Sequence, residues 1–412
     1  MNLFEEYITK KRMRLFTGNR EILMPSYIPE RLPHREKEVS RLGEILAPSL
    51  EGVKPSNVFI YGKTGTGKTA VVKYVLRDLE RVTTVHNLNV RSIYLNCETV
   101  NTHYSVLQNI GNFFMKKWDE RIPFTGWPME KVYETVKDKL NDFGGILIVV
   151  LDEIDKLITK SGDDVLYHLL NLNDELTKAR VSLIGISNNI QVTQMLDARV
   201  RSRLSQERIL FPPYNASQLK DILMDRVKLA KAEDVFSEEV IGLCAALAAH
   251  EHGDARRAID LLRISLEMAE REGAVKVLPR HVYEANSQIE LSCVAEAIRT
   301  LPIQQKLVLL SILLNSEMGK INQTTGEVYA TYSKLAKMVG MQVVSQRRVT
   351  DFISELDSLG LISASLKSFG RYGRTKIINP AIPVDEAKEV IVEDPFLEDL
   401  KHIKLPKQTV LR

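Results

Sequence analysis

The chain has 412 residues, of which 44% are hydrophobic and 26% charged, and its formal net charge is +3. This length predicts two or three globular domains, and the sequence shows neither an apolar run that could span a bilayer nor a secretory signal pattern at its start. The three cysteines (Cys97, Cys244 and Cys293) are too widely spaced for a metal motif or a disulfide framework, so we expect a cytoplasmic protein without membrane contact.

The N-terminal region carries two features. Residues 10–14 form a basic cluster, which we interpret as a solvated helix face rather than as an arm that contacts phosphates. Prolines then stiffen residues 27–35, ahead of a helix predicted over 36–46. A stiff segment just before a phosphate-binding loop can line the adenine side of a nucleotide pocket.

The strongest motif is the sequence GKTGTGKT at residues 62–69, between an apolar strand-like run (58–61) and a helical segment (70–79). Its glycines allow a tight turn whose N–H groups, with the helix N-terminus, form a cradle for phosphate. Lys68 supplies a cation for the β- and γ-phosphates, and Thr69 supplies a hydroxyl for Mg²⁺. We reject a turn without a ligand because all eight positions fit. The expected phosphate-binding residues are Gly62, Lys63, Thr64, Gly65, Thr66, Gly67, Lys68, Thr69 and Ala70.

A second strand is predicted over 92–96, and the segment that follows it is longer than a strand crossover needs. This insertion, about residues 99–141, holds a predicted helix (106–118), a break at 123–128 and a further helix from Met129. Such an insertion either contacts a partner or only packs against its own domain, and the sequence does not decide between these two interpretations.

The third predicted strand, residues 146–151, is an unbroken apolar run typical of a strand buried on both faces. Asp152 and Glu153 follow it, at the end of the sheet where open parallel sheets bind ligands. We expect Asp152 to hold Mg²⁺ and Glu153 to polarise the water that attacks the γ-phosphate.

A fourth strand is predicted over 181–187 and ends in Asn188, which we expect beside Asp152, where it can orient the attacking water; turn chemistry is the alternative. Three arginines follow: Arg199, Arg201 and Arg203. One can act as an arginine finger on a neighbour's nucleotide, and a solvated basic edge is the alternative. A fifth strand, 208–211, leads to Tyr214 through two prolines.

From residue 215 to 291 the pattern is helical. Arg256 falls in the first turn of the third helix predicted here. The helix dipole disfavours a cation at that position unless an anion is bound nearby, and a nucleotide phosphate would serve.

The last domain reads as helix, helix, turn, helix and a two-stranded ribbon, which is a winged helix-turn-helix. Residues 296–380 contain eleven Lys and Arg against six Asp and Glu, and the ribbon at 360–378 has no acidic residue. A basic wing predicts contact with DNA phosphates, although such a module can also bind only proteins. We expect residues 385–412 to pack partly or fray.

The order of these motifs resembles that of the archaeal initiators related to the eukaryotic origin recognition complex and its helicase-loading partner, within the AAA+ ATPases. The resemblance covers about residues 20–380 and implies an α/β AAA+ domain with a parallel five-stranded sheet (1–214). An all-α lid (215–292), a winged-helix domain (293–384) and a tail (385–412) would follow it.

The same resemblance implies residue roles. Lys68, Asp152, Glu153, the sensors Asn188 and Arg256, and the finger Arg203 rather than Arg199 or Arg201 would act in catalysis, with Thr69 and Asp152 on Mg²⁺. Tyr27, Ile28, Arg35, Tyr214 and Arg256 would bind ATP or ADP. The inserted helices would contact DNA together with Gln346, Arg347, Arg348, Lys367, Arg371, Tyr372 and Arg374.

We therefore expect a nucleoid-associated replication initiator, a slow ATPase used as a switch, that binds origin duplex DNA and helps load the replicative helicase beside paralogous initiators. A clamp-loader-like or remodelling ATPase that acts on proteins and an ATP-gated transcription regulator are the alternatives. Two separate elements expected to face DNA, the wing and the insertion, favour the initiator.

Overall fold

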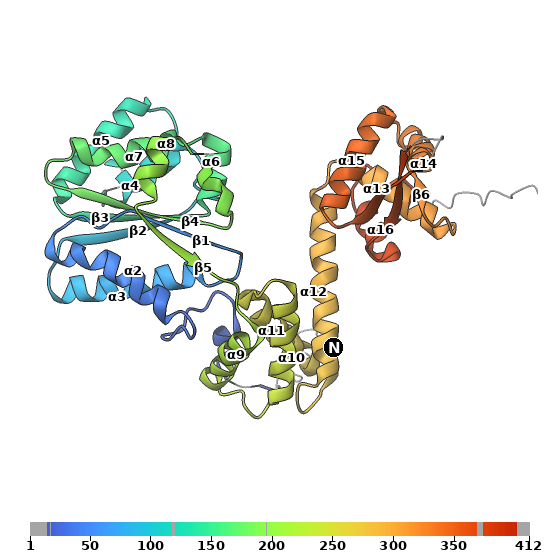
Figure 1. Cartoon of the computed structure of the whole chain (residues 1–412), viewed down its shortest axis with the longest axis horizontal. Coiled ribbons are helices and arrows are strands. Elements are labelled where there is room, and N and C mark those ends of the chain that lie inside the picture. The colour runs from blue at the N-terminus through green and yellow to red at the C-terminus, as the bar shows by residue number, and fades with distance from the viewer. Residues whose placement is uncertain (1–14, 17, 118–119, 195, 369–373, 402–412) are drawn as a thin grey trace, which may run out of the picture. The chain divides into compact units, whose positions relative to one another are not determined.

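The fold is that of a computed structural model, which describes residues 15–16, 18–117, 120–194, 196–368 and 374–401 (Figure 1). The chain divides into two compact units between Val282 and Tyr283. The basic cluster at 10–14 lies outside the described residues. In the described part of the chain, no helix combines the length and the apolar character needed to cross a membrane.

The first unit contains the predicted five-stranded parallel sheet. Its strands are β1 (Val58–Gly62), β2 (Val90–Asn96), β3 (Ile146–Asp152), β4 (Arg180–Ser187) and β5 (Glu207–Phe211). They lie in the order β2-β3-β4-β1-β5 and every neighbouring pair is parallel. The carboxyl ends of β1, β3 and β4 therefore meet at one end of the sheet. The phosphate-binding loop (the P-loop, residues 62–69) follows β1, Asp152 ends β3, and Asn188 follows β4.

Helices cover both faces of this sheet (Figure 1). Every residue of β3 is buried, with Leu147, Val149 and Leu151 in one apolar cluster and Ile148 and Val150 in the other. The face that carries Ile148 is covered by α2 (Glu36–Leu46), η2 (Ala47–Glu51) and α3 (Lys68–Val85). The opposite face is covered by α4 (His103–Phe113), α5 (Met129–Phe143), α6 (Ile154–Ser161), α7 (Asp164–Glu175), η4 (Ile190–Gln194) and α8 (Ala198–Leu204). Burial on both faces explains the unbroken apolar sequence of β3.

The insertion between β2 and β3 packs against the sheet through α4 and α5. The first helix begins at His103, since Thr102 and Ser105 form a capping box, and it ends at Phe113 rather than at the predicted residue 118. The chain after it returns to the core: Met115 and Ile122 are buried, and a Cβ on Gly111 would lie 2.6 Å from the Cδ1 of Ile122.

Three lid helices and the N-terminal arm, which is the described segment before α2, also belong to the first unit. The helices are α9 (Ala216–Ala230), α10 (Glu238–Glu251) and α11 (Ala255–Glu272), and the arm carries the short helix η1 (Arg20–Leu23). The arm packs on the lid, since Phe16 and Leu23 are buried and Arg20 forms a 2.5 Å ion pair with Glu270 of α11. The arm, which precedes the sheet in sequence, therefore packs against the lid, which follows it.

The second unit is a winged helix. Its elements are α12 (Pro279–Thr300), which begins in the first unit, α13 (Ile303–Glu317), β6 (Gln323–Thr324), α14 (Thr325–Met338), α15 (Gln346–Ser358), β7 (Ile362–Ser368), β8 (Arg374–Pro380), α16 (Val384–Val392) and η6 (Glu398–Leu400). The predicted two-stranded ribbon gains a third strand, because β6 pairs with β8. Ile391 and Leu397 are buried in the core, so this unit continues past residue 384, where we predicted its end.

Candidate nucleotide site and nucleic-acid surface

A cavity of about 730 Å³ lies at the carboxyl end of the sheet, between the P-loop, the arm and the lid. Most predicted nucleotide residues line it: Tyr27, Ile28, Arg35, Thr64, Gly65, Thr66, Gly67, Lys68, Thr69, Ala70, Asp152, Glu153, Asn188, Tyr214 and Arg256. Gly62 and Lys63 are not part of this lining, and their carbonyl oxygens accept hydrogen bonds from Lys68. The size and the mixed polar and apolar lining suit a nucleotide.

The P-loop needs glycine at two positions. Gly65 and Gly67 have φ values of 69° and 91°, which glycine adopts without strain. Space is also short: a Cβ on Gly65 would lie 1.6 Å from a carboxylate oxygen of Asp254, and one on Gly67 would lie 2.8 Å from the hydroxyl of Tyr214. The lid and the end of the sheet therefore pack directly on the loop.

Lys68 is buried beneath the loop. Its ammonium donates to the carbonyl oxygens of Gly62 (2.9 Å) and Lys63 (2.7 Å) and to the side-chain oxygen of Asn188 (2.9 Å). Burial lowers the pKa of Lys68 to about 8, against the opposing effect of the carboxylates of Asp152 and Asp254. A phosphate in the cavity would stabilise the charged ammonium and raise that pKa.

The residues expected to hold Mg²⁺ lie together. The Thr69 hydroxyl donates to a carboxylate oxygen of Asp152 over 2.8 Å, and Tyr94 of β2 donates its hydroxyl to the same oxygen. A hydroxyl and a carboxylate beside a phosphate cradle are the oxygen ligands that Mg²⁺ takes, so these residues fit the ion. When bound, the ion would neutralise charge on the phosphates. Burial raises the pKa of Tyr94, so its hydroxyl stays a donor.

Glu153 begins the turn after β3. It adopts a left-handed conformation with φ of 55°, and its N–H donates to Asp152 over 2.9 Å. Burial, followed by the carboxylates of Glu98, Asp152 and Asp155, raises the pKa of Glu153. A carboxylate with a raised pKa is a better proton acceptor, which suits a general base.

The lid touches the P-loop through the start of α11. Asp254 caps this helix by accepting from the N–H of Arg256 at 2.7 Å and of Arg257 at 3.2 Å. The N–H of Ala255 donates to the carbonyl of Gly65 over 3.1 Å. Arg256 is exposed on this first turn and lines the cavity.

The candidate arginine fingers lie apart from this cavity. The exposed Arg203 donates to Asn171 and lies 3.4 Å from Asp174, both on α7. Arg199 is also exposed and lies 3.4 Å from Asp197. Neither residue lines the cavity, so a finger from α8 would have to act on the nucleotide of another protomer.

Three residues of this site were not predicted. Tyr94 contacts Asp152 because Asn96 and Asp152 are register partners and Tyr94 lies on the same strand face, two residues earlier. The guanidinium of Arg226 is buried and donates to the carbonyls of Ile22 (2.9 Å) and Tyr27 (2.8 Å). Asp254 could have been found from the sequence, because an Asp just before a helix is a common N-cap. Tyr94 and Arg226 could not, because their contacts depend on the order of the strands and on the path of the arm.

Three of the predicted DNA-binding residues begin α15. Gln346, Arg347 and Arg348 are exposed, whereas Val349 and Phe352 face the core. The N–H of Arg348 donates to the hydroxyl of Ser345, the N-cap, over 3.4 Å. A helix N-terminus with two exposed arginines is electropositive.

The predicted wing residues are only partly visible. Lys367 and Arg374 lie on β7 and β8, and their side chains lie outside the described residues. Arg371 and Tyr372, between the two strands, lie outside them altogether.

The chain is 48% identical to the ORC1-type DNA replication protein of Thermococcus kodakarensis, over 99% of this chain and 97% of that protein. The chain belongs to the family of archaeal ORC1-type DNA replication proteins. The ORC1-type protein of Pyrococcus furiosus is 47% identical, over 98% of this chain and 96% of its own length. The predicted resemblance is thus confirmed.

Family models and a solved structure agree with this ORC1-type assignment. The model for the ATPase family associated with various cellular activities matches residues 58–213, that for the Cdc6 AAA+ ATPase-type lid domain matches 220–287, and that for the CDC6 C-terminal winged helix domain matches 296–390. The structure of the Aeropyrum pernix ORC1 protein in complex with DNA is 44% identical, with a TM-score of 0.81 over 93% of this chain and 98% of that one. The AAA+ base, the lid and the winged helix are therefore as predicted.

Proposed function

We propose that this ORC1-type protein is an ATP-dependent replication initiator that binds origin duplex DNA and helps load the replicative helicase. The exposed arginines at the start of α15 carry this proposal, since they lie in a chain 44% identical to an ORC1 protein whose structure is a complex with DNA. Contacts to phosphates would fix the register of the protein on the duplex, and a few base contacts or DNA deformability would supply sequence preference.

The nucleotide acts in this proposal as a switch. The N–H groups of the P-loop and Lys68 bind the phosphates, while Thr69 and Asp152 hold Mg²⁺. Glu153 accepts a proton from the attacking water, and Asn188 orients that water. The N–H of Ala255 in the lid donates to the carbonyl of Gly65 in the P-loop, which supports a lid position that depends on the bound nucleotide. Arg203 would sense the nucleotide of an adjacent protomer, such as a paralogous initiator.

Glu153→Gln tests the catalytic part. The amide keeps the shape of the side chain but cannot accept the proton, so hydrolysis should fall by roughly 100-fold or more while ATP binding stays within a few-fold of wild type. Single-turnover hydrolysis and equilibrium binding measure the two quantities separately. Wild-type turnover in this variant would remove Glu153 from the mechanism.

Footprinting on the genomic DNA of the source organism tests the initiator function against the alternatives. An initiator working in the cytoplasm at the nucleoid should protect a small number of sites near a replication start, in a pattern that changes between ATP and ADP. Indifference to DNA would favour an ATPase that acts on proteins, and protection confined to promoters would favour a transcription regulator.

A further inference from the structure

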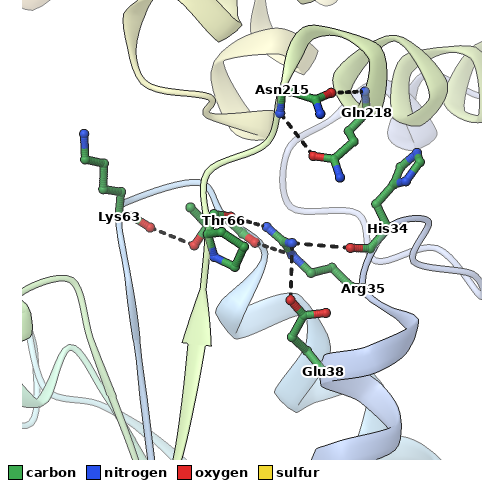
Figure 2. A network of polar contacts seen from close by, with 8 residues as sticks. His34, Arg35, Glu38, Lys63, Thr66, Asn215 and Gln218 are labelled. Atoms are coloured by element: carbon green, nitrogen blue, oxygen red, sulfur yellow. Dashed lines mark hydrogen bonds and ion pairs between the residues drawn. The ribbon is translucent and has the colours of Figure 1, made fainter.

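Arg35 is a buried cation beside the P-loop, with only 3% of its side chain exposed. Its guanidinium donates to two backbone carbonyls from distant parts of the chain: Nε to Thr66 over 2.9 Å and one terminal nitrogen to Pro212 over 2.6 Å (Figure 2). The other terminal nitrogen donates to the carbonyl of His34 over 3.3 Å and to Glu38 over 3.4 Å. Each of its three nitrogens therefore has a protein acceptor.

Aromatic packing fixes the plane of this guanidinium. Its carbon lies 3.9 Å from the ring centroid of Tyr214 and 5.5 Å from that of Phe211. Both rings belong to the exit from β5 toward the lid. Arg35 thus joins the beginning of α2, the P-loop and the connection between the sheet and the lid.

The bond to Thr66 determines the direction of one P-loop donor. In a trans peptide the C=O of one residue and the N–H of the next point to opposite sides of a rigid plane. The carbonyl of Thr66 points to Arg35, so the N–H of Gly67 points the other way. Thr66 cannot easily rotate this plane, because the residue is fully buried and its hydroxyl donates to the carbonyl of Lys63 over 2.9 Å.

We propose that Arg35 is a positioning residue, which aims the N–H of Gly67 at the bound phosphates and does not itself bind the nucleotide. Only an arginine fits this role, since its planar fork reaches Thr66 and Pro212 at once and stacks on Tyr214, whereas a lysine donates from a single point. The proposal rests on the proposed nucleotide binding and deepens it.

The test compares ADP with AMP. P-loop N–H groups cradle the α- and β-phosphates, AMP lacks the β-phosphate, and the proposal assigns the N–H of Gly67 to that β-phosphate. Arg35→Met should lower the affinity for ADP by about 10- to 100-fold, the effect expected for charge-assisted hydrogen bonds that are lost or misdirected. Its affinity for AMP should stay within about twofold of wild type. Competition against a fluorescent nucleotide on the full chain measures both affinities.

Arg226 provides the matched control. It is also a buried arginine that holds two carbonyls, those of Ile22 and Tyr27, but it acts on the arm at the adenine side. Arg226→Met should therefore weaken ADP and AMP together. If Arg35→Met also weakens both nucleotides equally, or weakens neither, Arg35 does not position the phosphate cradle.

One further variant covers a failure of Arg35→Met to fold. Arg35→Lys keeps the charge but not the planar fork, so it should show the same selective loss of ADP affinity, by a smaller factor. ADP binding at wild-type strength in a folded Arg35→Lys variant would overturn the proposal. Failure of the wild-type chain to bind ADP would instead refute the proposed nucleotide binding.

Discussion

The ammonium of Lys68 donates a hydrogen bond to the side-chain oxygen of Asn188 over 2.9 Å. These residues are 120 positions apart, and they meet because β1 and β4 are neighbours in the sheet. Asn188, which follows β4, is thus in direct contact with the lysine that would hold the β- and γ-phosphates.

This contact predicts the effect of Asn188→Ala. ATP binding should stay within about threefold of wild type, because Lys68 keeps its two carbonyl acceptors, whereas hydrolysis should fall by about 10- to 100-fold because the attacking water is no longer oriented. Binding by calorimetry and single-turnover hydrolysis separate the two effects. Asn189→Ala, at the adjacent position, is the control, and equal losses in both variants would argue against a specific role for Asn188.

The lowered pKa of Lys68 predicts a pH dependence. With a pKa of about 8, Lys68 is mostly charged at pH 7 and mostly neutral at pH 9. ADP affinity should therefore fall as pH rises through this range, by about 10-fold, since the phosphates lose a cation. Lys68→Ala should bind ADP weakly at every pH. A wild-type ADP affinity that does not change from pH 7 to pH 9 would contradict the proposal that a charged Lys68 holds the phosphates.

The bond from Tyr94 to Asp152 predicts a defect that depends on Mg²⁺. Tyr94→Phe removes the hydroxyl that orients this carboxylate, so ATP affinity in the presence of Mg²⁺ should fall by about 5- to 20-fold. Affinity measured with a chelator should not change. Tyr74→Phe is the control: it deletes a hydroxyl from α3 on the same face of the sheet, and ATP affinity should be unchanged both with Mg²⁺ and with a chelator. An equal loss with and without Mg²⁺ would exclude this role of Tyr94.

Much of this architecture could be predicted because its sequence signals are local. The unbroken apolar run of β3 requires burial on both faces, and the P-loop glycines require the backbone conformations observed at Gly65 and Gly67. The two-residue strand β6 could not be predicted, since Gln323 and Thr324 become a strand only by pairing with β8. For residues 385–412 we expected partial packing or fraying, and the structure shows Ile391 and Leu397 buried against the winged helix.

The contacts of Arg35 and Tyr94 depend on long-range structure. Arg35 reaches Pro212 across 177 positions, and Tyr94 reaches Asp152 across 58. No spacing rule links such residues until the order of the strands is known. Sequence patterns thus located the residues that would face the nucleotide, and the structure added those that hold them in place.

The salt dependence of duplex binding tests the DNA-binding account most directly. Affinity for duplex DNA should fall steeply with salt, and replacing Arg347 and Arg348 by alanine should lower it by about 10-fold or more and flatten the log–log slope by about 2, one unit for each lost phosphate contact. Arg299→Ala is a control from the same unit, since Arg299 is held by Glu393 at 2.9 Å. A double variant with the affinity and slope of wild type would contradict the proposal that α15 binds DNA.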